Sequence, residues 1–341
     1  AHAGKSGAAQ MASVTISQIA DCLMNLGRLD EAATEYQEAI TRSEELGDRR
    51  QAAVGKLNLG TVRLQQKRYK EAMEAYTEVR ATFEALGEPR TAAGAWHQIG
   101  IVYQEARQFG QAESAYRRSL AIMVREKDLA GEAATLNQLG NLYEAMVRLE
   151  ESVKCCRRAA DIYIRLQDLS DEGLVRNNLA IALIKLRRYD EARRELLRAI
   201  ECKKPYGHAA EPWKTWGVLY DLEQATGYPE AAAQAREQAL ESYLAYRRAG
   251  GQSYDWGAKA CAAVAEAIMA NEPSAIAALA DRLSGALQEL SQTQAGSRVN
   301  AVMPKLQAIL AGSREHALAD DPALWYVDAV ELKLLLESLT Q

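Results

Sequence analysis

The side chains best able to do chemistry are four histidines and five cysteines, and they are scattered along the sequence. The histidines are His2, His97, His208 and His316. The cysteines, an odd number without C-x-x-C spacing, are Cys22, Cys155, Cys156, Cys202 and Cys261. Such scatter predicts neither a zinc site nor a disulfide framework. We therefore expect no metal, no cofactor and a reducing, cytoplasmic location.

Three other patterns suggest chemistry and fail on inspection. Gly4–Ser6 looks like the end of a phosphate-binding loop, but the glycine and the strand that must precede it are missing. Cys155 and Cys156 are neighbours, and adjacent residues of a helix point to different sides, so a core thiol is predicted rather than a redox pair. The acidic pairs Glu150–Glu151 and Asp320–Asp321 fall at predicted helix starts, where the helix dipole favours carboxylates. The sequence predicts no catalytic residue and no enzyme.

A column of side-chain amides is the most informative polar feature. One position, repeated every 40 residues just before an Ile or Leu, holds Gln18, Asn58, Gln98, Gln138 and Asn178. Beside it, or one to two turns further on, stand His97, Asn137, Asn177, Asn141, Asn25, Gln65, Glu105 and Lys185, with Asp21 and Thr61 at the position of Asn141. An amide both donates and accepts, which suits a peptide backbone. The alternative is that these amides cap loops or bridge neighbouring helices.

The column belongs to an internal repeat of 40 residues that occurs five times in strict register. Two short strings recur in every unit. The first string ends at Ala20, Gly60, Gly100, Gly140 and Ala180, and the second string begins at Leu29, Tyr69, Phe109, Leu149 and Tyr189. Apolar residues fall at helical spacing, so each unit is predicted to hold two helices. The first ends near Gly27, Lys67, Arg107, Val147 or Arg187, and Gly47 and Gly87 close the second.

Small and large residues recur at fixed places in the two helices. Glycine inside a helix costs about 1 kcal/mol relative to alanine, so Gly60, Gly100 and Gly140 need compensation from close packing. Tyr36, Tyr76 and Tyr116 stand on the second helices, where Cys156 replaces the large residue of its unit. We expect small to face large across each hairpin.

These residues resemble the tetratricopeptide repeat, whose pattern is W-x2-L-G-x2-Y followed by A-x3-F. The third unit has Trp96, Ile99, Gly100, Tyr103, Ala112 and Tyr116, and a sixth has Trp213, Trp216, Gly217 and Tyr220. The 40-residue length is similar to that of kinesin light chains, Pins-type adaptors and bacterial signalling proteins with such repeats. The resemblance implies an all-α, right-handed α-solenoid of stacked helix-turn-helix units. It also implies that the first helices line a concave groove, where the amide column holds an extended peptide.

The repeat loses its register after the fifth unit, where Pro205–Gly207 marks an altered loop. We expect a repeat array over residues 1–250, and a degenerate seventh unit with a helical cap over 251–341. Two amphipathic helices, over Val299–Leu310 and Pro322–Leu339, are predicted to form that cap.

Composition limits the partners of this 341-residue chain. Hydrophobic residues make up 48% and charged residues 26%, without the run of about 18 apolar residues that spans a membrane. A net charge of −5 argues against nucleic acid as the partner. The predicted function is a scaffold that binds a peptide or protein. Self-association through the C-terminal helices and binding on the convex face are alternative modes of interaction. An alternative function is suggested by the start at Ala1: a regulatory segment of a larger signalling enzyme, such as a nucleotide-switch ATPase or a caspase-like protease.

Overall fold

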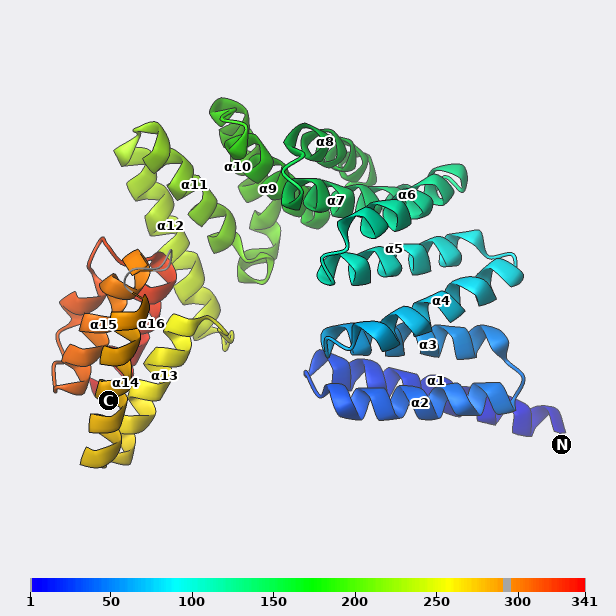
Figure 1. Cartoon of the computed structure of the whole chain (residues 1–341), viewed down its shortest axis with the longest axis horizontal. Coiled ribbons are helices and arrows are strands. Elements are labelled where there is room, and N and C mark those ends of the chain that lie inside the picture. The colour runs from blue at the N-terminus through cyan, green and yellow to red at the C-terminus, as the bar shows by residue number, and fades with distance from the viewer. Residues whose placement is uncertain (1, 291–295, 341) are drawn as a thin grey trace. The chain divides into compact units, whose positions relative to one another are not determined.

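The computed structural model describes residues 2–290 and 296–340, with the side chains of residues 11–289 and 296–340. Helices alternate with short turns, and the described residues form no β-strand (Figure 1). The chain forms two compact units, Ala1–Arg188 and Tyr189–Gln341. The all-α class predicted from the sequence is confirmed. The predicted limits of the repeat array, 1–250 and 251–341, concern the repeats rather than compactness and stay a prediction.

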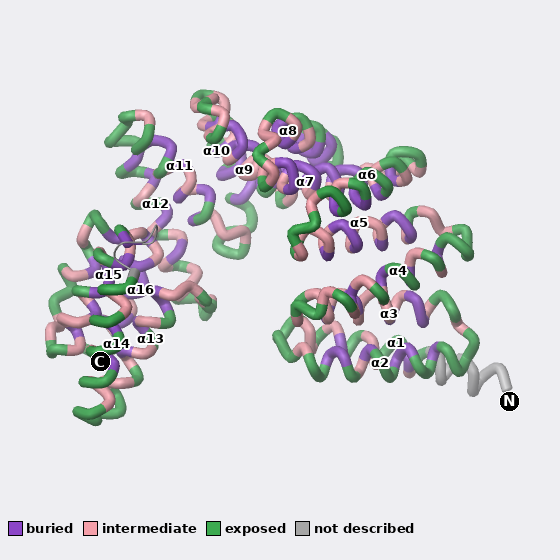
Figure 2. The backbone as a smooth tube through the Cα atoms, viewed as in Figure 1, coloured by how far each residue is buried: buried purple, intermediate pink, exposed green. Residues whose placement is uncertain are grey.

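The first unit consists of helical hairpins with a regular spacing. Its helices are α1 (His2–Asn25), α2 (Leu29–Glu45), α3 (Arg49–Gln65), α4 (Tyr69–Ala85), α5 (Pro89–Glu105), α6 (Phe109–Arg125), α7 (Leu129–Ala145), α8 (Leu149–Leu166) and α9 (Leu169–Lys185). Odd-numbered helices are the predicted first helices of the repeats, and even-numbered helices are the second ones. Figure 2 shows buried residues recurring along these helices, with exposed residues at the turns.

Left-handed residues close these helices, as the sequence predicted. Gly47 has φ 70° and follows the last turn of α2, where its N–H donates to the carbonyl of Glu44 at 2.9 Å. At the ends of the odd-numbered helices of the first unit only α1 uses glycine, and Lys67, Arg107 and Val147 adopt φ of 57–60° instead. Tertiary packing of the hairpin therefore enforces a turn geometry that these side chains disfavour.

The predicted small-to-large packing is confirmed. A Cβ atom at Gly60 would lie 2.7 Å from Cε1 of Tyr76, and one at Gly100 would lie 2.5 Å from Cδ1 and Cε1 of Tyr116. Gly140 faces the sulfur of Cys156 in the same way. Cys156 is fully buried, and burial raises the pKa of its thiol to about 12, as expected of a core cysteine.

The second unit begins with α10 (Tyr189–Lys203) and then leaves the regular pattern. The altered loop forms a 3-10 helix, η1 (Lys204–Ala210), in which Gly207 has φ 55°. It is followed by α11 (Pro212–Thr226), α12 (Pro229–Arg248), α13 (Trp256–Ala270), α14 (Pro273–Leu290), α15 (Gly296–Leu310), η2 (His316–Ala319) and α16 (Tyr326–Thr340). The two predicted C-terminal helices are thus present, although the last begins at Tyr326 rather than Pro322.

The last helix, α16, supplies the large residue that the sixth unit lacks. A Cβ atom at Gly217 would lie 2.7 Å from Cε1 of Tyr326, so the ring packing on this glycine comes from α16 and not from the helix that follows it. At Gly257 an added Cβ would overlap the carboxylate of Asp328, also on α16. Both glycines therefore allow the C-terminal helix to approach closely.

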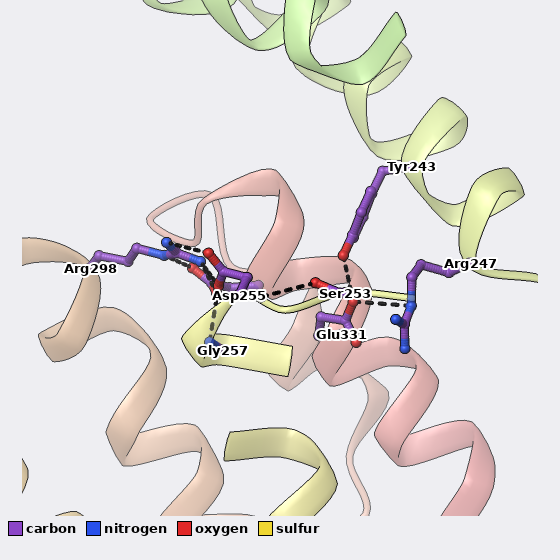
Figure 3. A network of polar contacts seen from close by, with 8 residues as sticks. Tyr243, Arg247, Ser253, Asp255, Gly257, Arg298 and Glu331 are labelled. Carbon is purple, nitrogen blue, oxygen red and sulfur yellow. Dashed lines mark hydrogen bonds and ion pairs between the residues drawn. The ribbon is translucent and has the colours of Figure 1, made fainter. Parts of the chain in front are cut away.

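Ion pairs and a buried hydrogen bond hold α16 against its neighbouring helices (Figure 3). Arg298 donates to Asp328 at 2.5 Å and to Asp255, the N-cap of α13, at 2.5 Å. Tyr243 of α12 donates a hydrogen bond of 2.6 Å to the buried carboxylate of Glu331. These contacts join α12, α13, α15 and α16, so the polar network stabilises the packing of these four helices.

Candidate functional site

The predicted amide column lies on the odd-numbered helices of the first unit, α1 to α9. Residues at positions such as 18, 21 and 25 share one side of their helix because they are three or four residues apart. We call this side, defined by Gln18, Asn58, Gln98, Gln138 and Asn178, the amide face. Gln18 is exposed, and the other four are half-buried.

Four of the five amides are not engaged within the part of the chain whose side chains the structure describes. The side chains of Gln18, Asn58, Gln98 and Gln138 make no hydrogen bond with any residue whose side chain the structure describes. Asn178 differs, because its Nδ2 donates to Oδ1 of Asn137 at 3.0 Å and so joins α9 to α7. The alternative reading of the column, as bridges between neighbouring helices, therefore applies to this one rung.

Around that bridge the amide face is more buried. Asn137 is only 7% exposed. Asn177 has a buried Oδ1 without a hydrogen-bond partner in the described part of the chain. An unpaired buried amide oxygen is unfavourable.

At the repeat position of Asn141, the residue of the second helix decides whether the polar side chain is hydrogen-bonded within its own hairpin. The hydroxyl of Tyr36 donates to Asp21, and that of Tyr76 lies 3.1 Å from Thr61, so both of these residues serve the second helix of their own hairpin. In the fourth unit the tyrosine is replaced by Cys156. Asn141 therefore has no hydroxyl to bind and stays half-buried on the amide face.

His97 is held inside the stack rather than presented to solvent. Its Nδ1 lies 3.1 Å from the hydroxyl of Thr135 on α7, and its ring meets Tyr116 edge-on at 5.6 Å. Burial lowers the pKa of His97 to about 4, so the ring is neutral at physiological pH. Sequence reasoning missed Thr135, whose repeat position holds Thr15, Gly55, Ala95 and Val175 in the other units.

The far end of the amide face carries exposed polar and charged groups. Asn25, Gln65 and Glu105 are exposed in the last turns of α1, α3 and α5. Lys185 forms an ion pair with Glu144 across α9 and α7. Sequence reasoning named Lys185 but missed this pairing, which neutralises the charge of Lys185. Among the described residues, no group of three His, Cys, Asp or Glu side chains could hold a metal ion.

Together these observations define a solenoid of helix-turn-helix repeats with a polar face formed by its odd-numbered helices. A family model, that of the tetratricopeptide repeat, matches residues 10–85, 91–163 and 131–204, more than half of the sequence. The chain belongs to the tetratricopeptide repeat family, and the predicted resemblance is confirmed. Its repeats are those of a protein-interaction scaffold.

Solved structures show the same fold at low sequence identity. The chain is similar to BtubC (BKLC) from P. vanneervenii, with 22% identity, a TM-score of 0.53, and coverage of 58% of this chain and 82% of that one. PilF of Pseudomonas aeruginosa shares 15% identity with a TM-score of 0.51, over 69% of this chain and 94% of PilF. Aspartyl phosphate phosphatase F of Bacillus subtilis shares 9% identity with a TM-score of 0.53, over 69% of this chain and 60% of the phosphatase. No curated protein sequence matches significantly. No helix in the described residues is both long and apolar enough to cross a membrane.

Proposed function

We propose that the first unit binds an extended segment of a partner protein along the amide face. The observation that carries this proposal is the set of amides at Gln18, Asn58, Gln98 and Gln138, which recur at one position and make no hydrogen bond with described residues. An amide can pair with both the N–H and the C=O of a peptide unit, whatever the side chain of that unit. A ladder of amides therefore recognises a backbone rather than one sequence.

The spacing of the ladder suits an extended ligand. Packed helices lie about 8–10 Å apart, and an extended chain advances about 3.3 Å per residue. If neighbouring odd-numbered helices contact one another, each amide meets about every third residue of the ligand. Asn141 and Asn177 add polar groups at the α7 and α9 end of this path.

The test separates binding from stability by using the bridged amide as the control. Peptides are selected from a random library on the immobilised wild-type chain, and their dissociation constants are measured by fluorescence anisotropy. We expect the triple variant Asn58→Ala, Gln98→Ala, Gln138→Ala to bind at least tenfold more weakly while its unfolding midpoint stays unchanged. Asn178→Ala, which breaks the bridge to Asn137, should lower the midpoint.

Unchanged affinity in the triple variant would contradict the proposal. The same conclusion would follow if substitutions confined to the even-numbered helices weakened peptide binding as much as the triple variant does. A peptide whose scrambled sequence retains most of its affinity would agree with backbone recognition.

A further inference from the structure

The chain fills one of its outer grooves with its own tryptophan. Trp96 lies in α5 and points between the second helices α4 and α6. The guanidinium carbon of Arg80 lies 4.8 Å from its ring centroid and that of Arg118 lies 4.6 Å away. Such contacts between a cation and an aromatic face are attractive. This groove is therefore closed by an indole held between two cations.

The same position in the next unit leaves a hollow. Leu136 of α7 replaces the tryptophan, and a shallow cavity of about 350 Å³ lies above it. Its apolar lining comes from three helices and consists of Leu120, Leu136, Leu139, Tyr143 and Cys155, and its basic border consists of Arg117, Lys154 and Arg158. We call this site the α7 hollow.

One of the two arginines that contact Trp96 has an equivalent at the α7 hollow, and an ion pair holds that equivalent in position. Arg158 is the equivalent of Arg118, one repeat later. It donates to Oε1 of Glu132 at 3.0 Å and 2.5 Å, and Glu132 is only 7% exposed. The equivalent of Arg80 is Leu120, which makes the floor more apolar. The hollow thus keeps one of the two arginines of the Trp96 groove and lacks its aromatic ring.

A second outer hollow lacks this character. The cavity of about 740 Å³ between α2, α3 and α4 contains Lys56 at the same repeat position. Lys56 forms ion pairs with Glu44 at 2.7 Å and with Glu78 at 2.5 Å, so its charge is already satisfied inside the chain. The apolar lining of this cavity consists of four alanines and Leu86, whereas that of the α7 hollow consists of three leucines, Tyr143 and Cys155.

We propose that the α7 hollow binds an aromatic side chain from a partner protein, within a segment rich in acidic residues. The aromatic ring takes the place that Trp96 occupies in the preceding unit, with one face on Leu136 and the other toward Arg158. The border explains the acidic neighbours: Lys154 is exposed and forms no ion pair with a described residue, whereas Arg117 and Arg158 beside it already pair with Glu113 and Glu132. Carboxylates beside the aromatic residue complement this charge.

This site is separate from the amide face. Leu136 and Gln138 are two residues apart, and each residue of a helix turns about 100°, so they point to nearly opposite sides of α7. The inference therefore goes beyond the proposed function, and each can fail without the other. A partner that used both would contact α7 from two sides.

The probes are the pentapeptide Glu-Asp-Trp-Asp-Glu and its counterpart with alanine in place of tryptophan, both with blocked ends. Binding is read from the rate at which iodoacetamide alkylates Cys155, measured by mass spectrometry of the digested chain. Exposed Cys22 is the internal control. We expect the tryptophan peptide to slow alkylation of Cys155 at least threefold and to leave Cys22 unaffected, and we expect the alanine peptide to protect neither.

Two variants test the geometry. Leu136→Trp copies Trp96 and should abolish protection by the peptide. Lys154→Glu should weaken binding at least threefold, whereas Ser114→Glu, at the same position beside the groove that Trp96 fills, should not. The triple amide variant should bind the pentapeptide as the wild type does. If Leu136→Trp fails to fold, Lys154→Glu and the alanine peptide decide the question.

Equal protection by both peptides, or protection that survives Lys154→Glu, would overturn the proposal. Protection of Cys155 that rises with protein concentration in the absence of peptide would assign the hollow to a second copy of the chain, and would also overturn it.

Discussion

Gly94 and Gly100 lie in the same helix, α5, but in opposite surroundings. A Cβ at Gly100 would lie 2.5 Å from two ring atoms of Tyr116, whereas nothing lies within 4 Å of a Cβ at Gly94. Alanine removes the helix penalty of glycine, about 1 kcal/mol, at either position. Overpacking a core costs about 1–3 kcal/mol. Tyr116 is fully buried and its hydroxyl donates to Gln104 at 3.0 Å, so the ring has little freedom to move away.

We therefore expect Gly94→Ala to stabilise the chain and Gly100→Ala to destabilise it, with a difference of about 1–3 kcal/mol between two substitutions of identical chemistry, because the helix contribution is common to both. Urea denaturation followed by circular dichroism measures both free energies of unfolding. In a Tyr116→Leu background the difference should shrink, because the contacting ring is gone. Equal stability of the two alanine variants would refute the reasoning that close packing compensates for the mid-helix glycines.

Three further perturbations test other contacts. Asn178→Ala leaves Oδ1 of Asn137 without its donor and should cost about 1–3 kcal/mol, measured by urea denaturation. Burial lowers the pKa of His97 from 6.5 to about 4, so the unfolded chain binds more protons between these values and stability should fall as the pH drops through this range; His97→Gln should show a smaller fall. Arg298→Met leaves Asp328, which is 1% exposed, without its cation; the cost should be about 3–5 kcal/mol, visible as early melting of the second unit by tryptophan fluorescence.

The repeated part of the fold could be predicted from the sequence because its contacts are local. A helix hairpin brings Gly60 against Tyr76 within one repeat, so the period alone reveals both partners. The turn geometry at Gly47 follows from glycine being the residue that best tolerates a positive φ.

Contacts between distant segments could not be predicted in this way. The ring that packs on Gly217 belongs to Tyr326 of α16, and no periodicity links the two residues. The network around Arg298 likewise joins helices that are far apart in the sequence. Within the amide column the sequence could identify the shared position, but it could not show that Asn178 is bound to Asn137, because that depends on side-chain conformation.

A polar side chain on the first helix of these repeats is left without a hydrogen bond when the second helix of its own hairpin carries no hydroxyl opposite it. Asp21 and Thr61 are occupied by tyrosine hydroxyls, whereas Asn141 stands at the same position opposite Cys156, which has no hydroxyl. The outer side follows the same rule, because Trp96 fills its groove and Leu136 does not. Both exceptions lie in α7, so this one helix presents a free amide on one side and an apolar hollow on the other. A partner that binds the first unit therefore has most to gain at α7.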